Sequence, residues 1–202
     1  MKHKGFTLLE FLFAMAIATV IIVIITTFAK DIITLNSSAQ SSMTGVLESR
    51  KILSVVVSEL RSATQSALGS YPVETASTST ITFFADMNAD GIADRVRYFV
   101  DLETNRLKRG VVFAIGEPPT YDIETETFST LITNISNSTS TPLFDYYDSN
   151  YSGTSTSMSL PISVPSVRLI KITIVVDEDP NRFPEPSILS SQAVLRNLKD
   201  NL

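Results

Sequence analysis

The chain has 202 residues, of which sixteen are basic and twenty-one acidic, so its formal net charge is -5. It contains no cysteine and a single histidine, His3. Disulfides, thiolate metal sites and a cysteine nucleophile are therefore excluded, and so is a serine–histidine pair beyond the first residues. The acidic balance also argues against direct binding of nucleic acid, and the composition as a whole predicts a protein that is not an enzyme.

The most informative segment is at the amino terminus, where Lys2 and Lys4 precede a nearly unbroken apolar run from Phe11 to Ala29. Nineteen helical residues rise about 28 Å, which is close to the hydrocarbon thickness of a bilayer. The run therefore predicts one membrane span. The two lysines place the amino terminus in the cytoplasm, and the chain after Lys30 is expected outside. Three threonines interrupt the run, and their hydroxyls are expected to bond back to helix carbonyls.

A secretory signal peptide and a plain single-pass anchor are the simpler interpretations of this segment. Ala14-Met15-Ala16 resembles a signal-peptide cleavage site, but the apolar run continues well past it. Neither interpretation explains Glu10, a carboxylate at the start of an apolar helix, where a charge is costly. The carboxylate either reaches the interface or pairs with a free amine created by cleavage just upstream, between Gly5 and Phe6.

Gly5-Phe6-Thr7-Leu8-Leu9-Glu10, with the basic leader and the apolar helix, resembles the leader of type IV prepilins. The resemblance implies that a prepilin peptidase cleaves after Gly5 and that Phe6 becomes a methylated amino terminus. It also implies that Glu10 neutralises the terminal amine of a neighbouring subunit during filament assembly. Residues 1–5 are then the leader, 6–29 the transmembrane and assembly helix, and 30–202 an extracytoplasmic domain.

Beyond the span, apolar residues recur at helical spacing: Met43, Val46, Leu53, Val56, Val57, Leu60, Ala63 and Ala67. This pattern predicts one helix from Phe6 to about Ala67, with Gly45 as a weak point and with Gly69 and Pro72 as stop signals.

After Pro72 the period changes to two, which predicts antiparallel strands with one buried face. The strands are expected around residues 80–85, 95–100, 169–176 and 192–197. Fifteen of the 31 residues from Ser129 to Ser159 are serine or threonine, which indicates loops or weak edge strands. The segment 177–186 has three prolines and is expected to be a loop. The fold class is therefore α+β, a long helix packed on an antiparallel sheet.

One metal site is conceivable at Asp86, Asn88, Asp90 and Asp94, which occupy positions one, three, five and nine of a calcium-loop pattern with Gly91 at position six. Arg97 stands at position twelve, where an EF-hand has a glutamate. Two interpretations remain open: a possible calcium site, and a hairpin turn rich in residues that bond their own backbone.

Residues 81–110 and Ala193-Val194-Leu195-Arg196-Asn197 resemble the J-type minor pseudopilins of type II secretion and related minor type IV pilins. The resemblance implies a structural filament subunit in the inner membrane. Its expected partners are other pilins or pseudopilins, the prepilin peptidase and the inner-membrane assembly platform. The alternative is a single-pass, membrane-anchored extracytoplasmic binding domain that does not assemble.

Overall fold

The computed structural model describes residues 5, 7–177 and 185–195, and it divides into two compact units, Met1–Ser41 and Ser42–Leu202. One helix, α1 (Leu8–Arg61), begins in the first unit and ends in the second. The strands are β1 (Val73–Ala76), β2 (Thr80–Ala85), β3 (Asp94–Asp101), β4 (Arg106–Val112), β5 (Thr127–Ile132), β6 (Phe144–Tyr147), β7 (Leu169–Val176) and β8 (Ser187–Val194). Two short 3-10 helices, η1 (Ile123–Thr125) and η2 (Val164–Ser166), lie in the connections.

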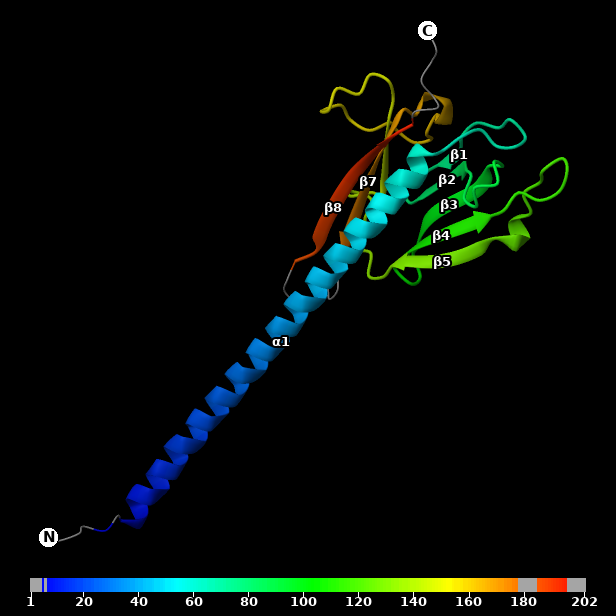
Figure 1. Cartoon of the computed structure of the whole chain (residues 1–202). Coiled ribbons are helices and arrows are strands. Elements are labelled where there is room, and N and C mark those ends of the chain that lie inside the picture. The colour runs from blue at the N-terminus through cyan, green and yellow to red at the C-terminus, as the bar shows by residue number, and fades with distance from the viewer. Residues whose placement is uncertain (1–4, 6, 178–184, 196–202) are drawn as a thin grey trace. The chain divides into compact units, whose positions relative to one another are not determined.

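The strands of the second unit form two antiparallel sheets, where the sequence analysis expected one (Figure 1). The first sheet has the order β1-β2-β3-β4-β5, a simple meander, and the second has the order β6-β7-β8. The carboxyl-terminal part of α1 packs against both, and one apolar cluster unites helix and sheets. The α+β class with a long helix on antiparallel strands is thus confirmed.

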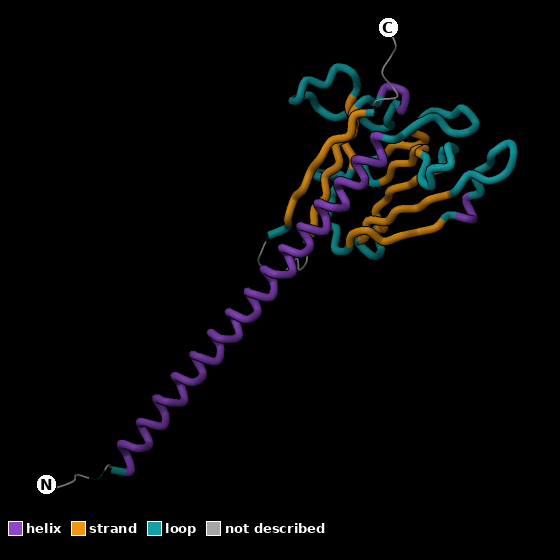
Figure 2. The backbone as a smooth tube through the Cα atoms, in the orientation of Figure 1, coloured by secondary structure: helices purple, strands orange, loops and turns teal. Residues whose placement is uncertain are grey.

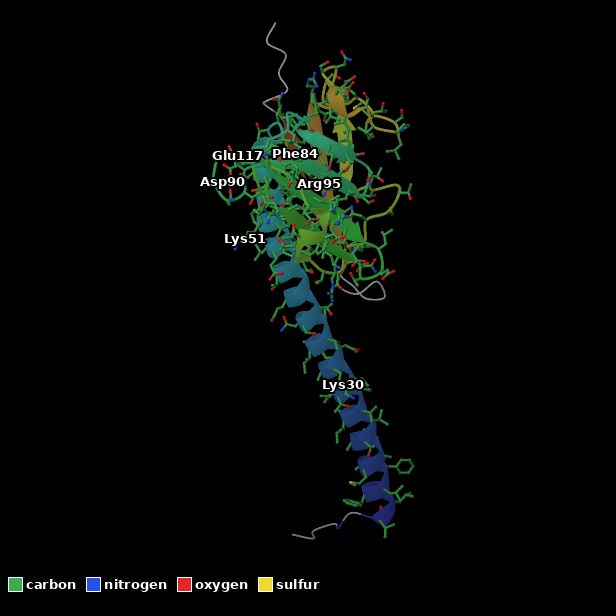
Figure 3. All side chains as sticks on the ribbon, turned by 90° about the vertical axis from the view of Figure 1, so that its right-hand side faces the viewer. Lys30, Lys51, Phe84, Asp90, Arg95 and Glu117 are labelled. Atoms are coloured by element: carbon green, nitrogen blue, oxygen red, sulfur yellow. The ribbon has the colours of Figure 1, made fainter. Side chains whose placement is uncertain are left out.

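The apolar stripe of α1 is confirmed in its central part, where Leu53, Val56, Val57, Leu60 and Ala63 are all buried. It is wrong at both ends, because Met43 is 71% exposed and Ala67 is also exposed. On the opposite side of α1, Lys51 points away from the sheets (Figure 3). The helix runs through Gly45 without interruption.

The helix ends at Arg61, six residues before the expected end near Ala67. The last turn tightens as the Ser62 amide donates to Glu59 and the Ala63 amide to Leu60. The next amide, that of Thr64, donates instead to the Phe84 carbonyl of β2 at 2.8 Å. A bond to a distant strand therefore replaces the next helical bond, and Gly69 and Pro72 lie beyond the actual end.

The expected alternation of buried and exposed residues is confirmed in β3, where Val96 and Tyr98 are buried and their neighbours are only partly covered. In β2 the expectation of one buried face is wrong, because Ile81 to Ala85 are all buried. The second face of β2 is covered by the connection between β4 and β5, which places the Tyr121 ring 5.2 Å from the Phe84 ring. The Tyr121 hydroxyl also donates to Ala93 and accepts from the Ala67 amide, so it fixes this cover.

The serine- and threonine-rich segment contains both expected features, edge strands and loops (Figure 2). β5 and β6 are outer strands of their sheets, and the remainder is mostly irregular. The final strand, β8, begins at Ser187, five residues before the expected start. Of the proline-containing loop, residues 178–184 lie outside the described part of the chain, as do Arg196 and Asn197.

Candidate functional site

The proposed cleavage site lies just before α1, where Gly5 is described and Phe6 is outside the described residues. A Cβ built on Gly5 meets no atom within 4 Å, and Gly5 is not among the glycines with positive φ. The fold of the described chain therefore places no demand for glycine at this position. A larger residue here is expected to leave the domain unchanged.

Glu10 forms a reciprocal hydrogen-bonded cap with Thr7 at the start of α1. Its Oε2 accepts from the Thr7 amide at 3.1 Å and from the Thr7 hydroxyl at 3.2 Å, and its own amide donates to that hydroxyl at 3.3 Å. This is the capping-box arrangement, which satisfies backbone N–H groups that the first helical turn leaves unpaired. The sequence analysis missed it, although Thr7-x-x-Glu10 is its local signature.

The apolar part of α1 presents large side chains on all sides, and the residues from Phe11 to Phe28 are exposed within the described unit. The three threonines of this run bond back to helix carbonyls, as the sequence predicts. Thr19 donates to the Met15 carbonyl at 2.8 Å, and Thr26 and Thr27 donate to Val23 at 2.9 and 3.1 Å. By length and composition this helix is able to cross a membrane, and it is the one such helix in the described chain.

The acidic loop between β2 and β3 is held by hydrogen bonds within itself, and Asp90 lies at the margin of the domain (Figure 3). Asp86 accepts from the amides of Ala89 at 2.7 Å and Gly91 at 2.9 Å. Asn88 donates to the Asp90 carboxylate at 2.8 Å, and Asp90 accepts from the Ile92 amide. Gly91 has a φ of +86°, which explains why glycine is favoured at this turn.

Asp94 is directed into the protein rather than toward the other three side chains. It is 1% exposed, and its two carboxylate oxygens accept from the amides of Met87 and Ala114, each at 3.0 Å. Across the described residues, no group of three or more His, Cys, Asp or Glu side chains could hold a metal ion. The separate backbone bonds of Asp86, Asp90 and Asp94 favour the hairpin-turn interpretation, and the calcium site stays a prediction.

Arg97, at position twelve of the calcium pattern, pairs with Glu126 on the outer face of the sheet. Its Nε and Nη2 donate to the two Glu126 oxygens at 2.9 and 2.7 Å. The Glu126 side chain is 4% exposed and lies over Gly110, where an added Cβ would come within 2.0 Å of Oε1. Glycine at position 110 is therefore required for this pair, which spans β4.

Glu59 links the last turns of α1 to the five-stranded sheet. It accepts from the Tyr98 hydroxyl at 2.7 Å and from Arg109 Nε at 3.0 Å. Burial, together with the negative charge of Glu59, raises the pKa of Tyr98 well above its usual range. Arg61, two residues further along the helix, donates to the Gln192 carbonyl of β8 at 3.1 Å. The end of the helix is thus bonded to both sheets.

The amino-terminal residues match a known family model, whereas wider comparisons give nothing. Residues 1–26 match the model described as the prokaryotic N-terminal methylation motif. No curated protein and no solved structure shows a significant match to the chain. The match covers Gly5, Phe6 and Glu10 and most of the apolar run. The chain therefore carries a prokaryotic N-terminal methylation motif ahead of a long apolar helix and an α+β domain.

Proposed function

We propose that this chain is a structural minor pilin or pseudopilin, cleaved by a prepilin peptidase between Gly5 and Phe6. Its amino-terminal helix then assembles with other pilins into a filament of a type IV pilus or a type II secretion-like system. The observation that supports this most is the coincidence of the methylation motif at residues 1–26 with an uninterrupted helix whose apolar side chains from Phe11 to Phe28 are all exposed. Such a surface requires lipid or other helices to cover it.

The topology and partners follow from the same proposal. Lys2 and Lys4 keep the amino terminus in the cytoplasm, and the domain lies on the opposite side of the inner membrane. The partners are other pilins or pseudopilins, the peptidase and the inner-membrane assembly platform. Among pilin-like proteins, the J-type minor pseudopilins and related minor pilins remain our preferred comparison. No catalytic role is proposed for the chain.

Processing is tested by mass spectrometry of the membrane-extracted protein, expressed with and without its cognate peptidase. The expected product lacks residues 1–5 and begins with a methylated Phe6. Gly5→Leu should block cleavage while the melting temperature of the domain stays unchanged, because no described atom lies near a Cβ at Gly5. An intact Met1 terminus, or a cut after Ala16, would contradict the proposal.

The cap between Thr7 and Glu10 favours a second candidate, a membrane-anchored binding domain that does not assemble. In that case Glu10 is satisfied within its own chain and needs no neighbouring amine. In the filament subunit, the negative charge of Glu10 pairs with the amine of a neighbouring subunit. In the anchored domain, Glu10 contributes only its capping hydrogen bonds with Thr7. Glutamine separates them, since it also serves in a capping box but has no charge.

A further inference from the structure

The chain carries four triplets of the form Asn-x-Ser/Thr, which begin at Asn36, Asn134, Asn137 and Asn150. Such a triplet is the acceptor sequence for N-linked glycosylation at the surface of an extracytoplasmic domain. Attachment of a sugar requires an exposed side-chain amide and a local backbone that fits into the active site of a transferase. The fold distinguishes the four triplets by these two requirements.

The triplets at Asn36 and Asn134 have backbones that the fold holds in place. Asn36 lies inside α1, where the backbone groups bond to one another, and its Oδ1 accepts from Gln40 Nε2. In the second triplet, Ile135 is 4% exposed and forms a bridge with Val176 of β7. Either triplet would have to leave its present structure before a transferase could bind it.

The side-chain amide of Asn137 is used by the domain itself. Its Nδ2 donates to the carbonyls of Thr141 and Thr173 at 3.0 and 2.8 Å, and its Oδ1 accepts from the Val175 amide at 3.1 Å. The nitrogen that would carry a sugar is therefore already bonded to β7 and to the loop before β6. This triplet does not meet the requirement for an accessible amide.

The fourth triplet, Asn150-Tyr151-Ser152, lies in the connection between β6 and β7, which is irregular from 148 to 163. Figure 1 shows this connection, in yellow, projecting beyond the strands. Asn150 and Ser152 are exposed. The residue between them anchors the triplet, because the Tyr151 ring lies 4.3 Å from the Tyr147 ring. The acceptor amide and the hydroxyl are thus both presented at the surface.

A carboxylate contacts the acceptor amide in this triplet. Asp148 Oδ2 accepts from Asn150 Nδ2 at 3.1 Å, and Asp148 Oδ1 accepts from the Asn150 backbone amide at 2.9 Å. The two bonds hold the side chain in one position relative to its own backbone. Among the described residues no other group bonds this nitrogen, so its second hydrogen has no partner there. The other three triplets have threonine or isoleucine at the position of Asp148.

We propose that Asn150 is the attachment site of an N-linked glycan and that Asp148 is a positioning residue for its amide. The donor is an oligosaccharide joined to a membrane lipid through a diphosphate, and a membrane-bound glycosyltransferase catalyses the transfer. Asn150 Nδ2 bonds to the anomeric carbon, the bond from that carbon to the diphosphate oxygen breaks, and the lipid diphosphate leaves with the electron pair. The amide loses one proton, and nothing is oxidised or reduced. The proposal goes beyond filament assembly and rests on the proposed topology, which places the domain outside the cytoplasm.

Mass spectrometry of the full chain, extracted from membranes of its native cells and digested, tests the assignment. The peptide that contains Asn150 should carry the additional mass of one or more saccharide residues, and fragmentation should assign that mass to Asn150. The triplets at Asn36, Asn134 and Asn137 should be unmodified. Unmodified Asn150, or sugar found instead on the serines of the same loop, overturns the proposal.

Variants of the triplet test its chemistry. Asn150→Gln and Ser152→Ala should each abolish the modification, whereas Ser152→Thr preserves the triplet and should retain it. Ser155→Ala is the matched control, because it removes a neighbouring hydroxyl and leaves the triplet intact. The melting temperature should stay unchanged in all four variants, since these side chains are exposed. A sugar that persists in Ser152→Ala contradicts the proposed acceptor.

The role of Asp148 is tested by the modified fraction of the chain. Asp148→Asn should reduce this fraction about tenfold at an unchanged melting temperature, because a charged acceptor holds the amide more firmly than a neutral one. Asp148→Glu restores the charge and should recover much of the loss, and Asp145→Asn on β6 is the control. Full modification of Asp148→Asn overturns the positioning role.

The amino terminus is read in the same spectra, so that the two proposals are tested separately. A chain that begins at Phe6 and has an unmodified Asn150 overturns the glycosylation site alone. A chain with an intact Met1 terminus and a sugar on Asn150 overturns the proposed processing and supports the glycosylation site.

Discussion

At the residue scale, Glu59 shows how one partly buried carboxylate connects a helix to a sheet. Its side chain is 15% exposed and its oxygens accept from both Tyr98 and Arg109. The two partners come from adjacent strands, so neither can shift along the helix without breaking a bond. The role of this carboxylate depends on residues that are about forty and fifty positions away in the sequence.

We expect Tyr98→Phe to lower the free energy of unfolding by about 1.5–3 kcal/mol, the usual contribution of a hydrogen bond to a charged group. Arg109 continues to neutralise Glu59 in this variant, so the loss reports the hydroxyl alone. Chemical denaturation of the full chain in detergent measures the effect. Tyr71→Phe is the control, because its hydroxyl donates to a carbonyl at an exposed position. Equal losses in the two variants would contradict the expectation.

The pair Asp101 and Lys108 predicts a defined pH dependence. Hydrogen bonds from Lys108 and then Thr104 lower the pKa of the Asp101 carboxyl to about 2. A carboxyl whose pKa is lowered on folding contributes stability above its unfolded pKa of about 4, and that contribution is lost as the pH falls toward 2. Melting temperatures from pH 5 to pH 2 should therefore fall less steeply in Lys108→Met than in the unmodified chain. Parallel curves would show that the pair contributes nothing.

At the element scale, the loop between β2 and β3 depends on Asp94 as a buried acceptor of two amides. Asn at this position offers one acceptor oxygen and turns a donor toward the second amide. We expect Asp94→Asn to cost about 1–3 kcal/mol of unfolding free energy. Asp90→Asn, at an exposed position in the same loop, should stay within about 0.5 kcal/mol. Thermal melts of the two variants measure the difference. Equal and small losses in both would contradict a structural role for Asp94 as a buried acceptor.

The same loop predicts the response to calcium. Because the carboxylates of Asp86, Asp90 and Asp94 accept separate backbone amides and do not converge, millimolar calcium should change the melting temperature no more than magnesium does. The measurement compares calcium, magnesium and chelator on the unmodified chain and on Asp86→Asn with Asp90→Asn. A rise specific to calcium that the double variant abolishes would restore the metal site.

Local patterns predicted α1, β2, β3, β7 and part of β8 but not β1 or β4, while contacts between distant segments decided the limits of the elements. The helical stripe and the alternation in β3 depend on periodicity, which the sequence displays directly. The end of α1 depends on the Phe84 carbonyl, and the second buried face of β2 depends on Tyr121. Neither contact has a local signature. Asp94 belonged to a motif by spacing, yet burial gave it a different role from Asp86 and Asp90. The cap at Thr7 and Glu10 was local, and it was missed because Glu10 was considered only as a charge.

At the scale of the whole molecule, the exposed apolar helix and the methylation motif occur in the first unit, whereas the apolar core is built in the second. Substitutions in the amino-terminal helix and in the core of the domain are therefore expected to have separate effects. Variants at the amino terminus should alter processing or assembly without lowering the melting temperature of the domain. Variants of the core should lower the melting temperature of the domain and leave cleavage at Gly5 unchanged.

Glu10 offers the corresponding prediction for assembly. Glu10→Gln keeps an acceptor for the Thr7 amide and loses the charge, whereas Glu10→Ala loses both. If a neighbour's amine needs the carboxylate, both variants should be processed and inserted, yet both should co-purify poorly with partner pilins. Thr7→Val is the control that weakens the cap and retains the charge. Normal co-purification of Glu10→Gln would show that assembly does not need the charge, whereas failure of the unmodified chain to co-purify with any pilin would support the anchored domain that does not assemble.

The bonds at the end of α1 also determine how the domain responds to tension. A pull on the amino-terminal end of the helix reaches the five-stranded sheet through Glu59 and the three-stranded sheet through Arg61. These contacts lie within one turn of each other, so they bear the load together instead of separating one after another. Tension along α1 is thereby divided between the inner strands β3 and β4 of the five-stranded sheet and the outer strand β8 of the three-stranded sheet.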